Sequence, residues 1–114
     1  MQILYQDKHL IVINKPSGLL SQPGSIKDSV HSRLQAQFPF VGLIHRLDQA
    51  TSGVMVLALT QLALSNIAKQ FQDRQTFKVY EARVFGRIPA KQGHVDLPLR
   101  CDWPNRPRQE VHTE

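Results

Sequence analysis

The feature that most constrains the fold is an unbroken apolar run from Val54 to Leu59, preceded by Gly53 and followed by Thr60. Six consecutive apolar residues between turn-forming residues are typical of a buried strand, and we expect both faces of this strand to be covered. The run is the longest of its kind in the chain. It is far shorter than the roughly twenty apolar residues of a membrane-spanning helix, so we predict a folded domain with no membrane segment.

Two shorter apolar segments before this strand predict a hairpin. Ile3–Tyr5 and Leu10–Ile13 are separated by the polar turn Gln6–His9, and their β-branched residues favour strands. The proline and glycine in Lys15–Gly18 are expected to end the second strand. A further strand is expected over Thr76–Phe85.

Two helices are also expected. The first begins at the serine-x-x-acid spacing of Ser25–Asp28 and continues to Pro39, with an apolar residue at every fourth position. The second spans Gln61–Asp73 behind Thr60 as its N-cap, with an apolar stripe of Leu64, Ile67, Ala68 and Phe71. Because strands and helices alternate irregularly and short links join several strands, we predict an α+β architecture rather than a doubly wound one.

The chain is basic, with 14 Lys and Arg against 9 Asp and Glu. A surplus of this size suggests a polyanionic partner, most commonly nucleic acid, although many small basic proteins bind none. Arg83–Arg108 holds six basic and two acidic residues, which indicates either an RNA-backbone surface or a solvated face. The single cysteine, Cys101, makes no internal disulfide, and we therefore expect a cytoplasmic location.

An acid, a base and small polar residues occur together in His45–Gly53, directly before the apolar strand. Loops at strand ends often carry catalytic groups. The residue types alone favour a turn, in which Asp48 accepts backbone hydrogen bonds and Arg46 is solvated. In an extended segment these two side chains would point the same way. The histidines have no metal-ligand spacing and no glycine-rich phosphate loop is present, so we predict neither metal nor cofactor.

Three motifs, in the right order, resemble the RluA family of pseudouridine synthases. The family's His-Arg-Leu-Asp, followed by two residues and Thr-Ser-Gly, stands at His45–Gly53. Its early motif matches Asn14–Leu20, and its Lys-x-Tyr-x-Ala-x-Val-x-Gly strand matches Lys78–Gly86. Cys101–Pro107 is similar to a segment of the type that acts on both ribosomal and transfer RNA. The resemblance implies the pseudouridine synthase fold, a mixed, mainly antiparallel sheet flanked by helices and loops.

The resemblance also implies that the domain continues past these motifs. A later family segment, built around Gly-Arg-Ser/Thr-His-Gln, supplies a second arginine to the active site and has no counterpart in this sequence. We therefore expect residues 1–114 to be the N-terminal portion of a single catalytic domain, with no separate RNA-binding domain. We also expect the isolated chain of residues 1–114 to be inactive.

The resemblance implies the family's reaction, the isomerisation of uridine to pseudouridine, in stem-loops of 23S ribosomal RNA and of transfer RNA (the anticodon stem-loop), without metal or cofactor. The resemblance implies that Asp48 is the catalytic carboxylate, since a carboxylate can add covalently to an electron-poor carbon and leave again. It implies that Arg46 helps extrude the target uridine, with a phosphate contact as the alternative. It implies that Tyr80 stacks on the target base. Thr51 and Ser52 are expected to hydrogen-bond the loop and fix Asp48.

Two other functional classes stay open from the sequence. A non-catalytic RNA-binding module could keep the fold and retain Asp48. A small aspartate-dependent hydrolase is disfavoured, because no second acid is paired with Asp48 in the sequence. An in-frame Gly-Arg-Ser/Thr-His-Gln segment after Glu114 would support the enzyme, and a stop codon there would favour the binding module. Lys15 lies in the early motif, whose family role is mainly structural, and it is given no catalytic role.

Overall fold

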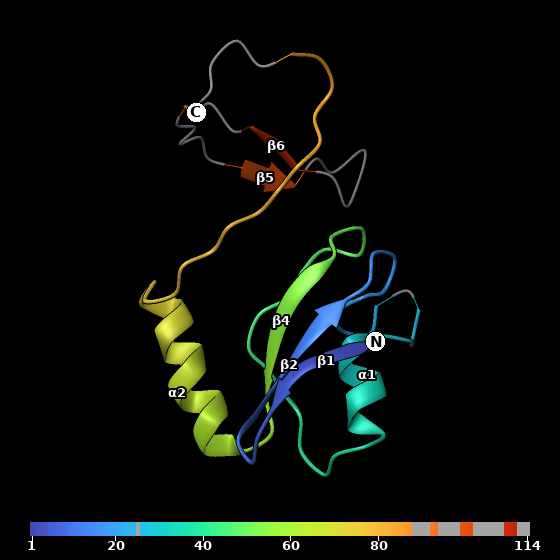
Figure 1. Ribbon diagram of the computed structural model, residues 1–114, viewed down its shortest axis with the longest axis vertical. Coiled ribbons are helices and arrows are strands. Elements are labelled where there is room, and N and C mark those ends of the chain that lie inside the picture. Colours follow the sequence, from blue (N-terminus) through green and yellow to red (C-terminus); the bar gives the residue numbers. More distant parts are fainter. Residues whose placement is uncertain (25, 88–91, 94–98, 102–108, 112–114) are drawn as a thin grey trace. The chain divides into compact units, whose positions relative to one another are not determined.

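The computed structural model describes residues 1–24, 26–87, 92–93, 99–101 and 109–111. The chain divides into two compact units, Met1–Val79 and Tyr80–Glu114. The first unit contains a four-stranded sheet and two helices (Figure 1). In the second unit, β5 (Leu99–Cys101) and β6 (Gln109–Val111) pair antiparallel.

The sheet of the first unit is built around the apolar run that dominates the sequence. Its strands are β1 (Gln2–Gln6), β2 (Leu10–Lys15), β3 (Gly42–Leu43) and β4 (Gly53–Ala58), in the spatial order β1-β2-β4-β3. All of the pairings between these strands are antiparallel. The predicted hairpin, the central strand and the α+β class with an antiparallel sheet flanked by helices are therefore confirmed for the described residues.

Helix α1 (Val30–Gln35) is shorter than predicted and begins later. Ser29 is its N-cap: the Ser29 hydroxyl accepts from the Ser32 N–H at 3.0 Å, and the Ser32 hydroxyl accepts from the Ser29 N–H at 2.8 Å. This reciprocal capping satisfies donors that a helix start leaves unpaired. The predicted start at Ser25 is therefore wrong, and the helix ends before Pro39 is reached.

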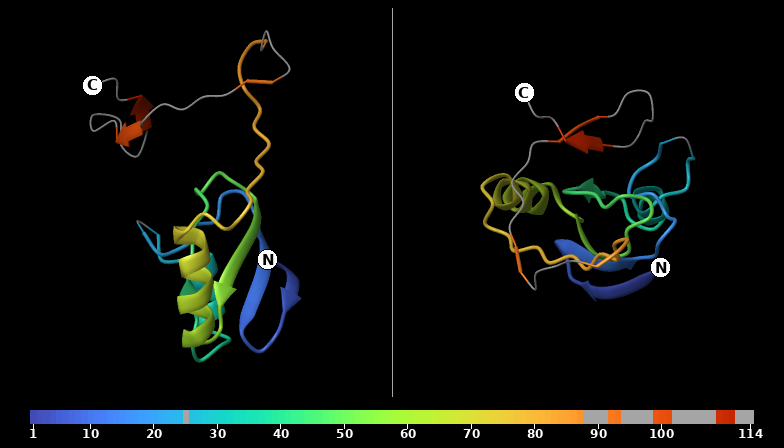
Figure 2. Two further views of the ribbon diagram at one scale, coloured as in Figure 1. Left: turned by 90° about the vertical axis from the view of Figure 1, so that its left-hand side faces the viewer. Right: turned by 90° about the horizontal axis from the view of Figure 1, so that it is seen from above.

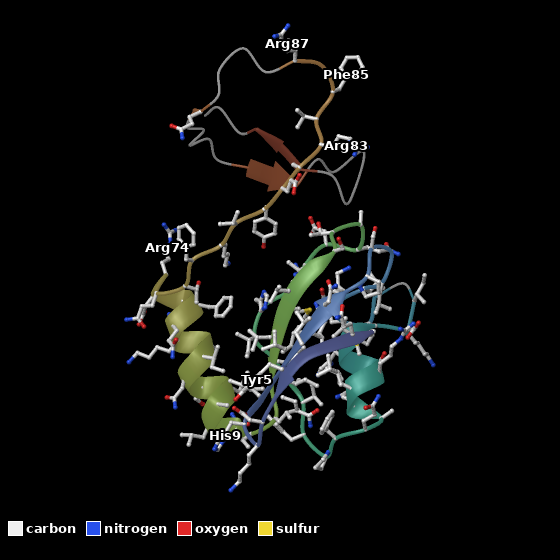
Figure 3. The ribbon with its side chains drawn as sticks, in the orientation of Figure 1. Tyr5, His9, Arg74, Arg83, Phe85 and Arg87 are labelled. Atoms are coloured by element: carbon white, nitrogen blue, oxygen red, sulfur yellow. The ribbon has the colours of Figure 1, made fainter. Side chains whose placement is uncertain are left out.

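Helix α2 (Gln61–Gln72) begins where the sequence predicted, because the Thr60 hydroxyl accepts from the Ala63 N–H at 3.2 Å. The same hydroxyl lies 3.1 Å from His9 Nδ1, which ties the β1–β2 turn to the start of α2 (Figure 3). Ala63 is buried, and the residues of the predicted apolar stripe are all half-buried. The stripe therefore packs on the sheet as its spacing predicts.

The core lies between the sheet and the helices, which lie on the same side of it (Figure 2). Met55 and Leu57 of β4 are fully buried, whereas Val54 is 65% exposed. The expectation that both faces of β4 are covered is wrong, because only one face meets the helices. The buried core residues are Ile11, Ile13, Leu19, Val30, Leu34, Val41, Leu47, Met55 and Leu57.

The strand predicted over Thr76–Phe85 does not form in the described structure (Figure 1). A strand needs a hydrogen-bonding neighbour, and no described strand pairs with this segment. Two of its apolar side chains are strongly exposed, Phe77 at 92% and Val79 at 79%. The segment therefore lacks a partner strand within the described fold.

Candidate functional site

Two loops meet at one end of the central strands. Lys15, the last residue of β2, pairs with Gly53, the first residue of β4. Because the two strands are antiparallel neighbours, the loop after β2 and the loop before β4 lie at the same end of the sheet. The second of these loops is the His45–Gly53 stretch that the sequence analysis singled out.

Arg46 and Asp48 are both exposed, on either side of the buried Leu47. Alternate side chains of an extended segment share a side, so the burial of Leu47 turns its two neighbours toward solvent. The loop thus exposes both the Arg46 guanidinium and the Asp48 carboxylate, and that their side chains point the same way stays a prediction. No described residue donates a hydrogen bond to the Asp48 carboxylate, whereas the Asp48 backbone carbonyl accepts from Thr51 N–H at 3.0 Å.

Ser21 anchors the loop at the residue just before Asp48. Its hydroxyl donates to the Leu47 carbonyl at 2.6 Å and accepts from the Leu47 N–H at 2.9 Å. Ser21 is itself buried, so this hydroxyl satisfies two backbone groups that have no access to water. The sequence does not predict this role, because Ser21 is 26 residues from Leu47 and belongs to no motif.

Lys15 anchors the loop at the residue just after Asp48. Its ammonium group donates to the carbonyl oxygens of Leu19 at 2.6 Å, Gln49 at 3.0 Å and Pro16 at 3.1 Å. The Lys15 side chain is fully buried. Burial lowers the pKa of Lys15, and the negative charge of Asp48 partly offsets that lowering.

Further bonds join the same two loops. The Gly18 N–H donates to the Gln49 carbonyl at 2.7 Å, and the Gln49 side-chain amide donates to the Gly18 carbonyl at 3.1 Å. Gly18 has a φ of +95°, a conformation that favours glycine. The Ser17 hydroxyl donates to the Ala50 carbonyl at 2.7 Å. The loop is therefore fixed mainly from the β2 side, rather than by the expected side chains of Thr51 and Ser52.

His45 anchors the other end of the loop to β4. The Val56 N–H donates to His45 Nε2 at 3.1 Å, so the ring is neutral there and its proton is on Nδ1. The ring stacks on Phe71 of α2, with centroids 4.7 Å apart, and the Lys78 ammonium lies 5.2 Å from the Phe71 centroid. Burial, with a smaller effect of the Lys78 charge, lowers the pKa of His45.

Tyr80 begins the second unit, and the residue is 63% exposed. Its place beside Asp48 stays a prediction. Arg83 and Arg87 of the predicted basic surface are exposed (Figure 3). The other basic residues of that surface lie outside the described residues or have side chains that are not described.

Within the described ranges, no three His, Cys, Asp or Glu side chains cluster closely enough to hold a metal ion. Neither of the two described helices has the length and apolar character needed to cross a membrane.

Comparison with protein families matches residues 9–114 to the RNA pseudouridylate synthase family. A dual-specificity RNA pseudouridine synthase RluA of Yersinia pestis is 55% identical over 114 residues, covering 97% of this chain and 55% of the relative. The protein of the same name from Escherichia coli K12 is 55% identical over 112 residues, covering 96% of this chain and 51% of the relative. The chain thus spans about half the length of these curated relatives.

Two solved human structures are similar to the described fold. RNA pseudouridylate synthase domain containing 4 matches with a TM-score of 0.53 and 38% identity, over 65% of this chain and 30% of that one. RNA pseudouridylate synthase domain containing 1 matches with a TM-score of 0.54 and 26% identity, over 64% and 28% respectively. Together with the family match over residues 9–114, these similarities establish that the chain belongs to the RNA pseudouridylate synthase family.

Proposed function

We propose that this chain is the N-terminal portion of the catalytic domain of an RNA pseudouridine synthase, with Asp48 as its catalytic carboxylate. The observation that carries the proposal is the exposed carboxylate of Asp48 in a loop whose flanking residues are anchored, Leu47 by Ser21 and Gln49 by Lys15. An accessible reactive group on a rigid support is what catalysis by positioning requires.

The proposed reaction keeps every atom of the uridine. The N1–C1′ bond breaks and a C5–C1′ bond forms, while the proton at C5 is lost and N1 gains one. An exposed carboxylate suits each of three routes: addition to the sugar carbon, addition to the base, or removal of a proton from the sugar. None of these routes needs a metal or a cofactor.

We propose that Arg46 contacts the RNA beside the target uridine, either by filling the space that the extruded base leaves or by binding a phosphate. Its guanidinium group is exposed and separated from Asp48 by a single residue, which places a cation next to the reacting carboxylate. A guanidinium group can donate to phosphate oxygens in a forked geometry. Tyr80 is proposed to stack on the base, a contact for which its exposed ring is free within the described structure.

The proposed substrates are stem-loops of 23S ribosomal RNA and of transfer RNA, because the curated relatives at 55% identity are named dual-specificity RNA pseudouridine synthases. Stem-loops present unstacked bases, whereas duplex RNA does not. The net charge of +5 and the exposed Arg83 and Arg87 favour a polyanionic partner. An enzyme with these substrates works in the cytoplasm.

The exposed segment after α2 supports the proposal that this chain is one part of a larger domain. Phe77 and Val79 are strongly exposed in a segment with strand-like sequence. Unpaired apolar strands are aggregation hazards that folded proteins normally cover. We infer that a strand from the rest of the protein pairs with residues 76–85, and that the chain of residues 1–114 alone is inactive.

The test is to incubate the complete protein encoded by the gene with synthetic stem-loops of both RNA classes and to quantify pseudouridine by nucleoside chromatography. Pseudouridine in at least one class supports the enzyme. The contrary result has two parts: the protein binds RNA in vitro without forming pseudouridine, and cells with and without the gene do not differ in the pseudouridine content of their RNA. That result would instead support a non-catalytic RNA-binding module.

A further inference from the structure

We propose that the guanidinium group of Arg74, at the C-terminal end of α2, binds a phosphate of the RNA backbone beside the target uridine. The inference rests on the proposed function, since it names a further contact of the same RNA with this domain. Arg74 belongs to the same compact unit as Arg46 and Asp48, and it lies where the chain leaves the helix (Figure 3). It is not proposed to touch the reacting atoms.

The first argument is the backbone conformation of Arg74. Its φ is +54°, and among the described residues it is the only one other than glycine with a positive φ. The Arg74 N–H donates to the Phe71 carbonyl at 3.2 Å, and the Gln75 N–H donates to the Gln70 carbonyl at 2.8 Å. These two bonds form the Schellman ending of a helix, whose left-handed position usually holds glycine. A residue with a Cβ is strained there, so arginine makes the fold less stable than glycine would.

The second argument is that the fold itself has little use for this cation. A cation near a helix C-terminus interacts favourably with the helix dipole, but Lys69 already supplies one in the last turn of α2. Arg74 is exposed, and no acidic group in the described part of the chain forms an ion pair with it. A strained residue that the fold does not require points to a functional use.

The third argument is the position of this helix end. Helix α2 runs back along the sheet from Thr60, whose hydroxyl lies beside the β1–β2 turn, to Phe71, whose ring stacks on His45. His45 directly precedes Arg46, so the helix ends where the loop exposes Arg46 and Asp48. An RNA whose target base is held at Asp48 therefore brings its neighbouring phosphates to this end of the sheet.

The fourth argument is the charge of this helix end. Residues 69–78 hold one acid, Asp73, and three exposed basic residues, which are Lys69, Arg74 and Lys78. The Lys78 ammonium lies 5.2 Å from the centroid of the same Phe71 ring that contacts His45. The surplus of positive charge favours a polyanion, and the forked donors of a guanidinium group match the oxygens of a phosphate.

The test measures three quantities in the complete protein: the Tm, the Kd for stem-loop RNA at several salt concentrations, and the single-turnover rate at saturating RNA. Arg74→Gly relieves the backbone strain and removes the charge. We expect the Tm to rise by about 2–4 °C, while the Kd increases about tenfold. The slope of log Kd against log salt concentration should become shallower by about one. The rate at saturating RNA should change by less than about twofold, because a phosphate contact binds substrate and transition state equally.

Two control variants separate a phosphate contact from a general loss of charge. Arg74→Lys keeps the positive charge and the left-handed residue, so it should keep the wild-type salt slope and a Tm near that of the wild type. Lys8→Gln removes an exposed charge from the turn before β2, at the opposite end of the sheet. It should leave the Kd and the salt slope unchanged, because a distant surface charge is screened at about 0.1 M salt.

A wild-type Kd and salt slope in Arg74→Gly would overturn the inference. Weaker binding accompanied by a lower Tm would also overturn it, since the arginine would then serve the fold. An equal loss of binding in Lys8→Gln would do the same, because the effect would then follow net charge alone. Wild-type protein that binds neither class of stem-loop would instead count against the proposed function.

Discussion

The Ser21 hydroxyl makes two hydrogen bonds to the backbone of Leu47, donating to its carbonyl at 2.6 Å and accepting from its N–H at 2.9 Å. A side chain from one loop thereby takes the place of a strand partner for the residue that precedes Asp48. The bond pair is buried, so water cannot replace it.

Ser21→Ala should destabilise the protein by about 1–3 kcal/mol, because a buried N–H and a buried carbonyl lose their partner. Ser17→Ala is the matched control: it removes the exposed hydrogen bond to Ala50, and water can replace it, so the cost should be below about 1 kcal/mol. Urea denaturation of both variants measures the difference. Equal free energies of unfolding for the two variants would show that the Leu47 anchor contributes nothing.

The pH dependence of stability should contain a contribution from His45. Burial and the Lys78 charge lower the pKa of His45 in the folded state, while the unfolded value is about 6.5. As the pH falls below about 6.5, His45 is therefore protonated in the unfolded state before it is protonated in the folded state. The free energy of unfolding decreases until the pH passes the lowered pKa of His45 in the folded state. Above about pH 6.5 this contribution is fully present.

His45→Gln provides the check, because a glutamine carbonyl can accept from the Val56 N–H without titrating. Thermal melts between pH 5 and 8 should show a smaller decrease in Tm toward acid for His45→Gln than for the wild type. Parallel curves for the two proteins would mean that the His45 ring does not titrate differently in the folded state.

Gly42→Ala should destabilise the packing of α2 against the sheet. A Cβ at Gly42 would lie 2.9 Å from Leu64 Cδ2, closer than real contacts allow, and 3.2 Å from Leu64 Cγ, tighter than most real contacts. Leu64 is half-buried and has some room to move, so we expect a cost of about 1 kcal/mol, the low end for overpacking. Gly24→Ala is the control, since its Cβ would make only an ordinary contact at 3.8 Å with Leu20. Indistinguishable melting temperatures would refute the predicted clash.

The local elements could be predicted because their signals are local. The hairpin of β1 and β2, the run that forms β4 and the Thr60 cap of α2 each depend on neighbouring residues, and all three are confirmed. The sequence predicts the start of α1 at the wrong serine, because Ser25 and Ser29 both have a polar residue three positions later. Only the structure distinguishes them, through the reciprocal bonds of Ser29.

The rest depends on contacts between distant residues. Sequence identified Arg46 and Asp48 through a motif, but it could not identify Ser21 and Lys15 as their anchors, since the contacts span 26 and 34 residues. The strand expected over residues 76–85, which overlap a strand motif of the resembled family, is absent from the described fold. A local motif does not supply the neighbouring strand that makes the hydrogen bonds.

Tyr80 offers a test of base stacking in the complete protein. Tyr80→Ala should weaken the stabilisation of the target base by about 1–3 kcal/mol, the range for one stacked base, and should slow pseudouridine formation accordingly. Tyr80→Phe retains the ring and should keep most of the rate. Single-turnover assays of both variants make the comparison, and a stronger defect in Tyr80→Phe than in Tyr80→Ala would exclude stacking as the role of Tyr80.

The most direct test of the account replaces Asp48 by asparagine in the complete protein and measures pseudouridine formation and RNA binding on the same stem-loop. The side chain is exposed and accepts no hydrogen bond from a described residue, so Asp48→Asn should fold normally. We predict that pseudouridine formation is abolished while the Kd for RNA stays close to the wild-type value. Substantial turnover by Asp48→Asn, or an equal loss of binding and turnover, would contradict the assignment of Asp48 as the catalytic carboxylate.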